Sequence, residues 1–307
     1  MKSEYRNFTE TLNKRGKPRI QTDFRLSRIC TMGTGGECDL LITPDSIDCL
    51  IDTVRELRRH GIRYKVVGAA SNLIFSDRGF RGAVIRTTAL NGIKLTESGS
   101  IECEAGVFLP VLTRFTASNG FGGFHGLCGI PGTVGGSVIT AAGAFGCNIS
   151  DYVSSCLVYR AETDEVEELK LSADNFGYRY SPLRSENCVV LRVSFTPPQE
   201  DNAVILRKMR DCAEKRASTQ PKGERSVGSF FKRPEGAPPA AFLIDRAGMK
   251  GASVGGARVS EIHAGFIINA GNATTEDVLS LANAVKLGVF EKFGVMLTEE
   301  AELVREK

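Results

Sequence analysis

The sequence predicts an α+β protein built from three consecutive units. Segments with helical and strand periodicity alternate in the first and last thirds of the chain, whereas the middle third holds short strand-like runs around the glycine-rich stretch 120–146. Pro197-Pro198, followed by Gln-Glu-Asp-Asn, marks the clearest linker. A chain of 307 residues suffices for two or three packed domains. We expect domains at 1–88, 89–198 and 199–307.

The first unit is expected to contain a helix over 47–60 between strands. Asp45 or Ser46 supplies its N-cap, and Gly61 ends it. Strands are predicted at 64–67 and 82–86, on either side of the segment GAASN. The apolar face of the helix consists of Ile47, Leu50, Ile51, Val54 and Leu57.

The later units are predicted in the same way. The middle strands are 101–104, 156–160, 166–169 and 189–195, with a hairpin turn at 162–165. The last unit contains helices at 203–217, 240–246 and 275–290 and strands at 265–269 and 295–297. Thr274 and Asp277 have capping-box spacing. The inward-facing residues are Leu206, Met209, Cys212 and Ala213 on the first of these helices and Val278, Leu281, Val285 and Val289 on the last.

Composition argues against several classes of protein. The formal net charge is only +3, which gives no electrostatic reason to expect binding to nucleic acid or a bilayer. No apolar stretch approaches the about 18 residues that a membrane span needs, and the polar N-terminus lacks a signal-peptide core. Nine cysteines without a CxxC pair, together with three histidines, predict no disulfide framework and no metal site, which is typical of a cytosolic protein.

Two glycine-rich loops stand out, at 67–73 and at 126–137 with its continuation 142–146. Small residues after a strand let backbone N–H groups approach an anion closely. Either loop alone could serve only tight turns, but the pair suits a long ligand that carries a pyrophosphate. Neither is a Walker A motif, and neither is a Rossmann fingerprint.

The run G-I-P-G-T-V-G-G at 129–136, followed by A-G-A-F-G, resembles the second FAD loop of the UDP-N-acetylenolpyruvoylglucosamine reductases. These belong to the vanillyl-alcohol-oxidase and p-cresol-methylhydroxylase-like flavoproteins. GAASNLIFSDRGFRGAVI at 68–85 is similar to the first FAD loop, and the resemblance covers nearly the whole chain. It implies a two-part FAD-binding region followed by an α+β substrate-binding domain, with non-covalent FAD and with NADPH as co-substrate. The implied cofactor-binding residues are Gly68, Ala69, Ala70, Ser71, Asn72, Leu73, Gly129, Ile130, Pro131, Gly132, Thr133, Gly135, Gly136, Ser137, Ala142, Gly143 and Gly146.

The sequence departs from the family pattern in both loops. Ala69 and Ala70 replace glycines, and a Cβ at a position that needs φ > 0 costs on the order of 1 kcal/mol. Thr140-Ala141 stands where the family often has Met-Asn. Arg233 stands at a position that is usually asparagine.

The resemblance also assigns three candidate catalytic residues, Ser229, Arg179 and Glu300. By themselves these read as a turn serine, a surface arginine and a solvated glutamate. In the family, the serine of G-S-x-F-K donates a proton, the arginine of Y-R-x-S lies at the enolpyruvyl carboxylate, and the glutamate of G-V-x-L-x-x-E assists. These roles match the need of an enolpyruvyl reduction for an acid and for stabilisation of the enolate. Glu299 remains an alternative to Glu300, because only one of two adjacent strand residues points inward.

A basic group follows the linker, and its plain interpretation is a solvated helix end. Family precedent implies that it supplies counter-charge for a UDP diphosphate. His263 is expected to be structural, and the short spacing between Arg179 and Ser229 resembles the family form without a tyrosine-bearing loop. The implied substrate-binding residues are Tyr178, Lys215, Arg216, Lys222, Lys232 and Arg233.

The leading hypothesis is therefore a cytosolic, monomeric reductase that acts in peptidoglycan precursor synthesis and hence in cell-wall growth and division. Its substrate is the enolpyruvyl ether of a UDP-linked amino sugar, and shared use of one flavin face predicts ping-pong kinetics. A carbohydrate or alcohol oxidase of the same superfamily is the first alternative. Such enzymes often tether FAD covalently, and His125 and Cys128 lie near the second loop. A flavin-binding module without catalysis is the second alternative.

Overall fold

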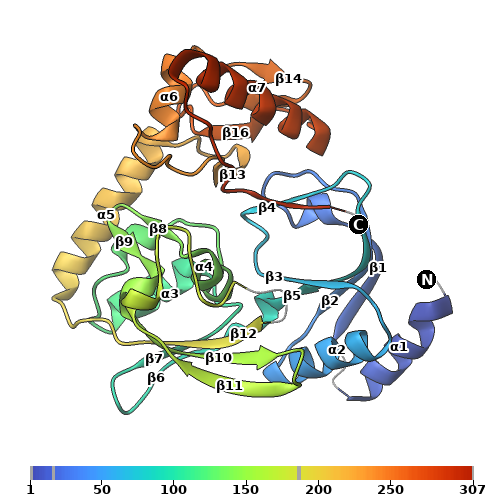
Figure 1. The fold of residues 1–307 in the computed structure, drawn as a ribbon. Helices are drawn as coiled ribbons and strands as arrows, with labels where there is room; N and C mark the ends of the chain where they lie inside the picture. The colour runs from blue at the N-terminus through green and yellow to red at the C-terminus, as the bar shows by residue number, and fades with distance from the viewer. Residues whose placement is uncertain (1–2, 16–17, 185–187, 306–307) are drawn as a thin grey trace. The chain divides into compact units, whose positions relative to one another are not determined.

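The computed structural model describes residues 3–15, 18–184 and 188–305 and confirms the α+β class (Figure 1). The chain forms two compact units, and each unit combines segments that are distant in the sequence. The first unit runs up to residue 22 and includes 40–69 and 82–215, and the second consists of 23–39, 70–81 and the chain from 216 onward. The expected division at residues 88 and 198 stays a prediction.

The first unit contains a four-stranded sheet in the order β1-β2-β5-β3, in which β3 and β5 are parallel. Two helices cover one face of this sheet (Figure 1). Three of the strands continue at one end into segments of the second unit. The elements are α1 (Ser3–Arg15), β1 (Arg19–Arg25), β2 (Glu37–Thr43), α2 (Ile47–Arg59), β3 (Tyr64–Val67) and β5 (Phe80–Arg86).

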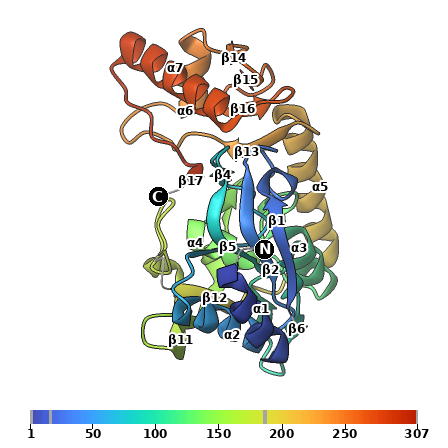
Figure 2. The ribbon, with the colours of Figure 1, turned by 90° about the vertical axis from the view of Figure 1, so that its right-hand side faces the viewer.

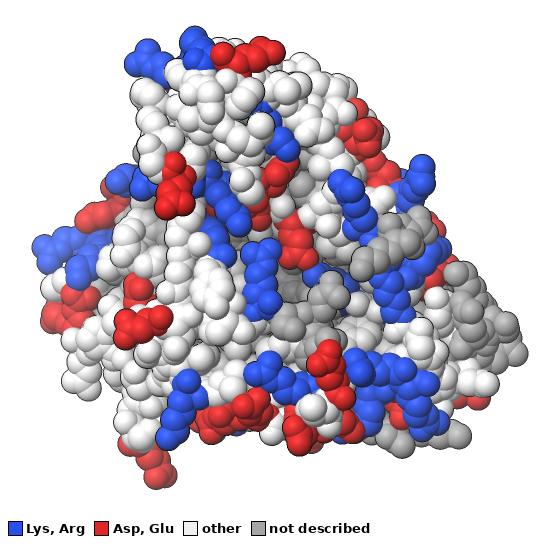
Figure 3. Space-filling view, viewed as in Figure 1, with Lys and Arg blue, Asp and Glu red and all other residues white. Residues whose placement is uncertain are grey.

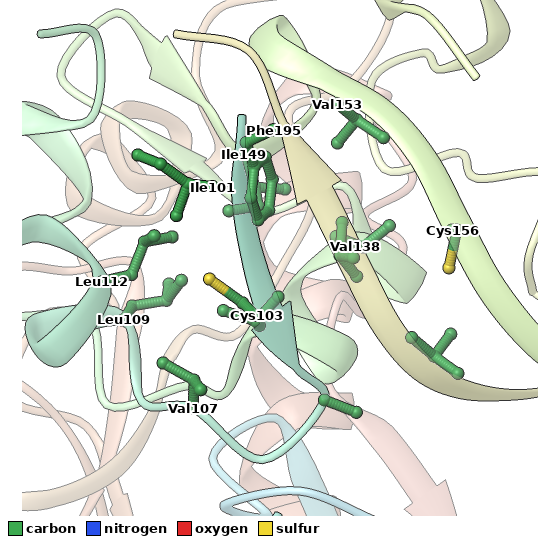
Figure 4. Close-up of a cluster of buried hydrophobic side chains, with 14 of the residues drawn as sticks. Ile101, Cys103, Val107, Leu109, Leu112, Val138, Ile149, Val153, Cys156 and Phe195 are labelled. Atoms are coloured by element: carbon green, nitrogen blue, oxygen red, sulfur yellow. The ribbon is translucent and has the colours of Figure 1, made fainter. Parts of the chain in front are cut away.

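The second sheet of the first unit is antiparallel, in the order β11-β10-β12-β7-β6. Its strands are β6 (Ile93–Leu95), β7 (Ile101–Glu104), β10 (Val153–Arg160), β11 (Glu165–Lys170) and β12 (Cys188–Phe195). Helices α3 (Leu109–Ser118) and α4 (Val134–Thr140) pack on one face through a core that includes Cys103, Leu112 and Val138 (Figure 4). A short hairpin, β8 (Gly143–Ala144) and β9 (Cys147–Asn148), and the long helix α5 (Asn202–Thr219) follow in sequence.

The second unit contains a sheet in the order β13-β16-β15-β14, in which all pairs are antiparallel. Helix α7 packs against β14, β15 and β16 (Figure 2). A separate parallel pair joins β4, next to the first glycine loop, to the C-terminal strand β17. The elements are β4 (Leu73–Phe75), β13 (Arg225–Ser229), α6 (Ala240–Arg246), β14 (Ser253–Val254), β15 (Ala257–Val259), β16 (Phe266–Asn269), α7 (Thr275–Phe293) and β17 (Glu302–Val304). Five 3-10 turns lie at Leu26–Arg28, Thr87–Ala89, His125–Leu127, Ile149–Tyr152 and Ala173–Asn175.

Most predicted elements are confirmed, with ends that shift by one to three residues. Ser46 caps α2 by accepting from the Cys49 N–H, and the Thr274–Asp277 capping box is present at the start of α7. The apolar stripe predicted on α7 is buried. These features depend on residues within two or three turns of one another, which explains why the sequence alone predicts them.

Two predictions are wrong. No strand forms at 295–297, where Met296 is 59% exposed. The C-terminal strand is β17 at 302–304 instead, because this segment pairs with β4, which lies far earlier in the chain. The face predicted for α5 is also wrong, since Leu206 is 59% exposed and Ala213 is exposed, while Ile205 is buried. Periodicity did not locate the buried face of a helix that is mostly in solvent.

The cysteines behave as core residues in most cases. All nine are free, and burial raises the pKa of Cys38 and of Cys156 to about 12, so these thiols remain protonated at neutral pH. Among the described residues no group of His, Cys, Asp and Glu has the arrangement of a metal site. No helix in the described ranges is both long and apolar enough to cross a membrane. Basic and acidic side chains are interspersed over the face shown in Figure 3.

Candidate active site

The first glycine loop is tightly packed at its first residue. A Cβ on Gly68 would overlap the Thr133 hydroxyl of the second loop, so this position requires glycine for lack of space. Ala70 is buried with φ of +53°, in the left-handed region that favours glycine. Ala69 does not have a positive φ, so the predicted strain falls on Ala70 alone.

The rest of the first loop is held by hydrogen bonds within the second unit, three of which involve side chains. The Thr31 hydroxyl donates to the Ser71 carbonyl at 3.3 Å, and the Cys30 thiol donates to the Leu73 carbonyl at 2.9 Å. The Asn72 side chain donates from Nδ2 to the Glu300 carbonyl at 3.1 Å. The Asn72 side chain was expected at the cofactor, and its bond to Glu300 could not be foreseen because 228 residues separate the two.

The second loop lies at the start of α4 and is equally crowded. A Cβ on Gly135 would be 2.8 Å from the Ala105 Cβ, and the Gly135 N–H donates to the Ala105 carbonyl at 2.9 Å. The Thr133 hydroxyl is buried and has no hydrogen-bond partner in the part of the chain that the structure describes. A buried hydroxyl without a partner costs free energy unless a ligand supplies one. The two loops therefore fit a ligand with phosphate oxygens that approach closely.

Three other glycines predicted to bind the cofactor lie near Gly135 in the sequence. Gly129 and Gly146 have φ of +80° and +79°, and Gly143 pairs with Asn148 in the β8–β9 hairpin. Ala141 and Phe145, which were not among the predicted cofactor residues, take φ of +47° and +51°. Backbone in sparsely populated conformations tends to cluster at functional sites.

Arg179 lies on a two-residue turn of the first unit. Gly177 and Tyr180 exchange backbone hydrogen bonds of 3.1 Å across this turn, and Arg179 takes φ of +55°. Its Nη1 donates to the Ala141 carbonyl at 3.0 Å, and its guanidinium carbon lies 5.4 Å from the ring centroid of Tyr178. Tyr178 is 62% exposed. The turn thus presents a planar cation and an aromatic ring beside the second glycine loop.

Ser229 and Glu300 are brought together in the second unit. Ser229 ends β13 with its side chain exposed, and the next residue, Phe230, accepts a hydrogen bond of 2.8 Å from the Glu300 N–H. Lys232 donates to the Thr298 carbonyl at 2.9 Å, so the two segments run alongside each other. The backbone segments that carry Ser229 and Glu300, which are distant in the sequence, therefore lie side by side at one sheet edge.

An ion pair distinguishes the two adjacent glutamates. Lys286 donates to the Glu299 carboxylate at 2.8 Å. Partial burial opposes ionisation of Glu299, but the hydrogen bond from Lys286 prevails and lowers the pKa of this carboxyl. Glu299 is thus committed to an ion pair with α7, which leaves Glu300 as the candidate acid.

The predicted basic residues are distributed over both units. In the first unit the Lys215 ammonium lies 5.7 Å from the Phe145 ring centroid. In the second, Arg216 donates to the Gln220 side chain at 2.9 Å, Lys222 and Arg233 are exposed, and Lys232 is half-buried.

His263 and His125 are both partly buried. His263 accepts from the Gly265 N–H at 3.1 Å, and burial lowers its pKa. His125 lies 3.4 Å from the Cys147 sulfur, and burial lowers its pKa as well.

Two family models match separate parts of the chain. Residues 220–304 match the C-terminal domain of UDP-N-acetylenolpyruvoylglucosamine reductase, and residues 38–169 match an FAD binding domain. A UDP-N-acetylenolpyruvoylglucosamine reductase from Carboxydothermus hydrogenoformans is 38% identical over 97% of this chain and 98% of its own length. The chain belongs to this family.

Other members of the reductase family support the assignment. One from Caldicellulosiruptor saccharolyticus is 37% identical over 95% of this chain and 96% of its own length. The crystal structure of the reductase from Thermus caldophilus matches with a TM-score of 0.79 and 31% identity, covering 93% of this chain and 99% of the other. The FAD-domain match includes both glycine loops, so FAD is the cofactor, and their crowded glycines and the buried Thr133 hydroxyl fit it.

Proposed function

We propose that this protein reduces UDP-N-acetylglucosamine enolpyruvate to UDP-N-acetylmuramate, with FAD as cofactor and NADPH as electron donor. The observation that carries the proposal is the hydrogen bond from the Glu300 N–H to the Phe230 carbonyl, which sets the backbone at Glu300 beside that at Ser229, in a chain that matches reductases of this name over nearly its full length. Neither an oxidase nor a flavin-binding module needs a serine and a glutamate held on neighbouring segments in this way. The family match favours neither alternative.

The cofactor would be held by the two glycine loops and their flanking residues, 68–73, 129–137 and 142–146. Bound FAD supplies the hydride chemistry that links NADPH to the enolpyruvyl double bond. The chain itself contributes loops without bulky side chains, so that backbone N–H groups can reach phosphate oxygens.

The second half of the reduction adds a proton to the carbon that carries the carboxylate. In our proposal Ser229 donates this proton, and Glu300 donates a hydrogen bond to the enolate. Arg179 offers a two-pronged donor to the enolpyruvyl carboxylate, and its bond to the Ala141 carbonyl orients the guanidinium. The positive φ of Arg179 is consistent with a residue placed for function rather than for local stability.

Recognition of the UDP portion is assigned to Tyr178 and to the basic residues Lys215, Arg216, Lys222, Lys232 and Arg233. Exposed ammonium and guanidinium groups can offset the charge of a diphosphate. We further propose a cytosolic monomer, on the strength of the balanced charge and the free cysteines. The three-domain division at residues 88 and 198 belongs to the same proposal.

An anaerobic absorbance experiment tests the function. The flavin band should bleach with NADPH and return when the enolpyruvyl nucleotide is added. Ser229→Ala should still bleach, but its band should return about 10²- to 10⁴-fold more slowly, the range expected for loss of a general acid. Ser226→Ala, on the same strand, serves as the matched control and should behave like the parent.

Other outcomes identify the alternatives. A band that returns only with oxygen would favour an oxidase, and FAD that stays with acid-precipitated protein would support that interpretation. A flavin that NADPH does not reduce would favour the binding module. Initial-rate plots that intersect rather than run parallel would contradict ping-pong kinetics.

A further inference from the structure

Arg86 is a half-buried arginine whose charge the described part of the chain does not balance. It ends β5, and its Nε is buried without a hydrogen-bond partner. No ion pair is formed by this side chain among the described residues. Burial lowers its pKa, which shows that the surroundings disfavour the charge. Another arginine on the same strand, Arg81, instead donates to the buried Asp39 carboxylate at 2.8 Å.

The position of Arg86 places it beside the first glycine loop. β3 and β5 are parallel, and Arg86 pairs in register with Val67, the residue before Gly68. Neighbouring strands lie about 4.8 Å apart, so the base of Arg86 is one strand away from the start of the loop. The Thr87 hydroxyl donates to the Val67 carbonyl at 3.3 Å and fixes this end of the strand pair.

The face of the sheet on which Arg86 lies follows from alternation. Ala83 and Ile85 point into the core covered by α1 and α2, so Arg86 is on the opposite face. Gly68 itself packs on Thr133, whose hydroxyl is also buried without a partner among the described residues. Two buried polar atoms that lack partners, the Arg86 Nε and the Thr133 hydroxyl, are thus carried by residues on either side of the start of the first loop: one on the neighbouring strand and one in contact with Gly68.

A ligand anion would satisfy both groups. Leaving a buried guanidinium N–H without an acceptor costs free energy, and a formal negative charge offsets that cost better than a neutral acceptor does. Arginine matches phosphate oxygens with parallel N–H donors, and the absence of a side chain at Gly68 leaves room for a phosphate to approach. The neutral flavin ring does not supply such a charge, whereas the diphosphate of the dinucleotide does.

We propose that Arg86 binds the diphosphate of FAD, together with the Thr133 hydroxyl. This inference rests on the proposed FAD-dependent function and adds a cofactor residue outside the two glycine loops. Arg86 was absent from the residues predicted from the sequence. The only hint there was a cation at the end of the apolar strand GAVIR, directly across from the loop.

Flavin titrations of deflavinated protein test the proposal. Replacing Arg86 by methionine keeps an unbranched apolar stem but removes the guanidinium and its charge. We expect Arg86→Met to weaken FAD binding about 10- to 100-fold, the range for losing a hydrogen bond to a charged group. Riboflavin, which has no phosphate, should bind the variant and the parent equally. Arg86→Lys should lose less affinity for FAD than Arg86→Met, because it retains a point charge.

Thermal unfolding without flavin separates binding from structure. Arg86→Met should melt no lower than the parent, since it removes a half-buried cation whose Nε has no partner among the described residues, and added FAD should raise its melting temperature less. Arg81→Met is the matched control and should melt lower, because it leaves the buried Asp39 carboxylate without its arginine.

Three results would overturn the proposal. One is equal loss of FAD and riboflavin binding, which would indicate a ring contact or a structural role. Another is unchanged FAD affinity in Arg86→Met. The third is a raised KM for the UDP substrate with normal FAD affinity, which would assign the arginine to the other diphosphate. If the parent protein itself binds no FAD, the proposed function fails instead.

Discussion

The two glycine loops resemble each other in sequence but differ in what their small residues do. In the second loop, Gly135 is required for space, because Ala105 lies against it. In the first loop, Gly68 is also required for space, but the position that needs a positive φ is occupied by Ala70. In the first loop, glycine therefore stands where a Cβ would collide, and alanine stands where only the dihedral angle is demanding.

The loops also differ in how each one holds a candidate catalytic residue. The first loop uses a side chain, since Asn72 donates to the Glu300 carbonyl within the second unit. The second loop uses its backbone, since the Ala141 carbonyl accepts from Arg179 within the first unit. A side-chain contact is removed by one substitution, whereas a backbone contact survives most substitutions in the loop. The first loop is thus the more vulnerable to mutation.

The largest effect is expected at Gly68, because a side chain there would overlap Thr133. Gly68→Ala should lower the free energy of unfolding by about 1–3 kcal/mol, as other overpacking substitutions do. Urea denaturation of the flavin-free protein measures this. Adding Thr133→Ala should recover part of the loss, because it removes the hydroxyl that the new Cβ would overlap. Equal losses in the single and double variants would show that the two residues do not collide.

Asn72 tests the side-chain contact. Asn72→Ala should slow the return of the flavin band with the enolpyruvyl nucleotide by about 3- to 10-fold, the equivalent of one hydrogen bond. Bleaching by NADPH should be unaffected. Thr31→Ala, which removes a different support of the same loop, is the control. If both variants slow both half-reactions alike, Asn72 supports the loop rather than Glu300.

Gly146 isolates the cost of the dihedral angle in the second loop. It has φ of +79°, and nothing lies within 4 Å of a Cβ built there. Gly146→Ala should therefore cost only about 1 kcal/mol of unfolding free energy, all of it from the backbone. A loss of unfolding free energy as large as that of Gly68→Ala would show that a positive φ costs as much as a steric overlap.

The smallest effect is a stabilisation in the first loop. Ala70→Gly should raise the free energy of unfolding by about 0.5–1 kcal/mol, because relief of the positive φ outweighs the added freedom of the unfolded chain. Ala69→Gly should have the opposite sign, since Ala69 has no positive φ to relieve. Thermal unfolding of both variants without flavin gives the comparison directly, and stabilisation by both would contradict it.

Prediction from sequence succeeded where the determining contacts are local. The Ser46 cap, the Thr274–Asp277 capping box and the buried stripe of α7 depend on residues a few positions apart. It failed at 295–297, where a short apolar run does not specify its own pairing partner, and on α5, where Leu206 lies in solvent. The candidate catalytic residues were named through family resemblance, and the hydrogen bonds around them came from the structure.

The sequence by itself determined the α+β class, the two glycine loops, the family and the identity of Ser229, Arg179 and Glu300 as candidates. Only the tertiary structure decided that Glu299 is paired with Lys286, that Asn72 binds the Glu300 carbonyl, and that the Nε of Arg86 is buried without a partner among the described residues. The physical reason is the sequence separation of the residues involved. Caps, periodicity and motifs depend on residues within a few turns of chain, whereas these contacts join segments that meet only after the sheets have formed.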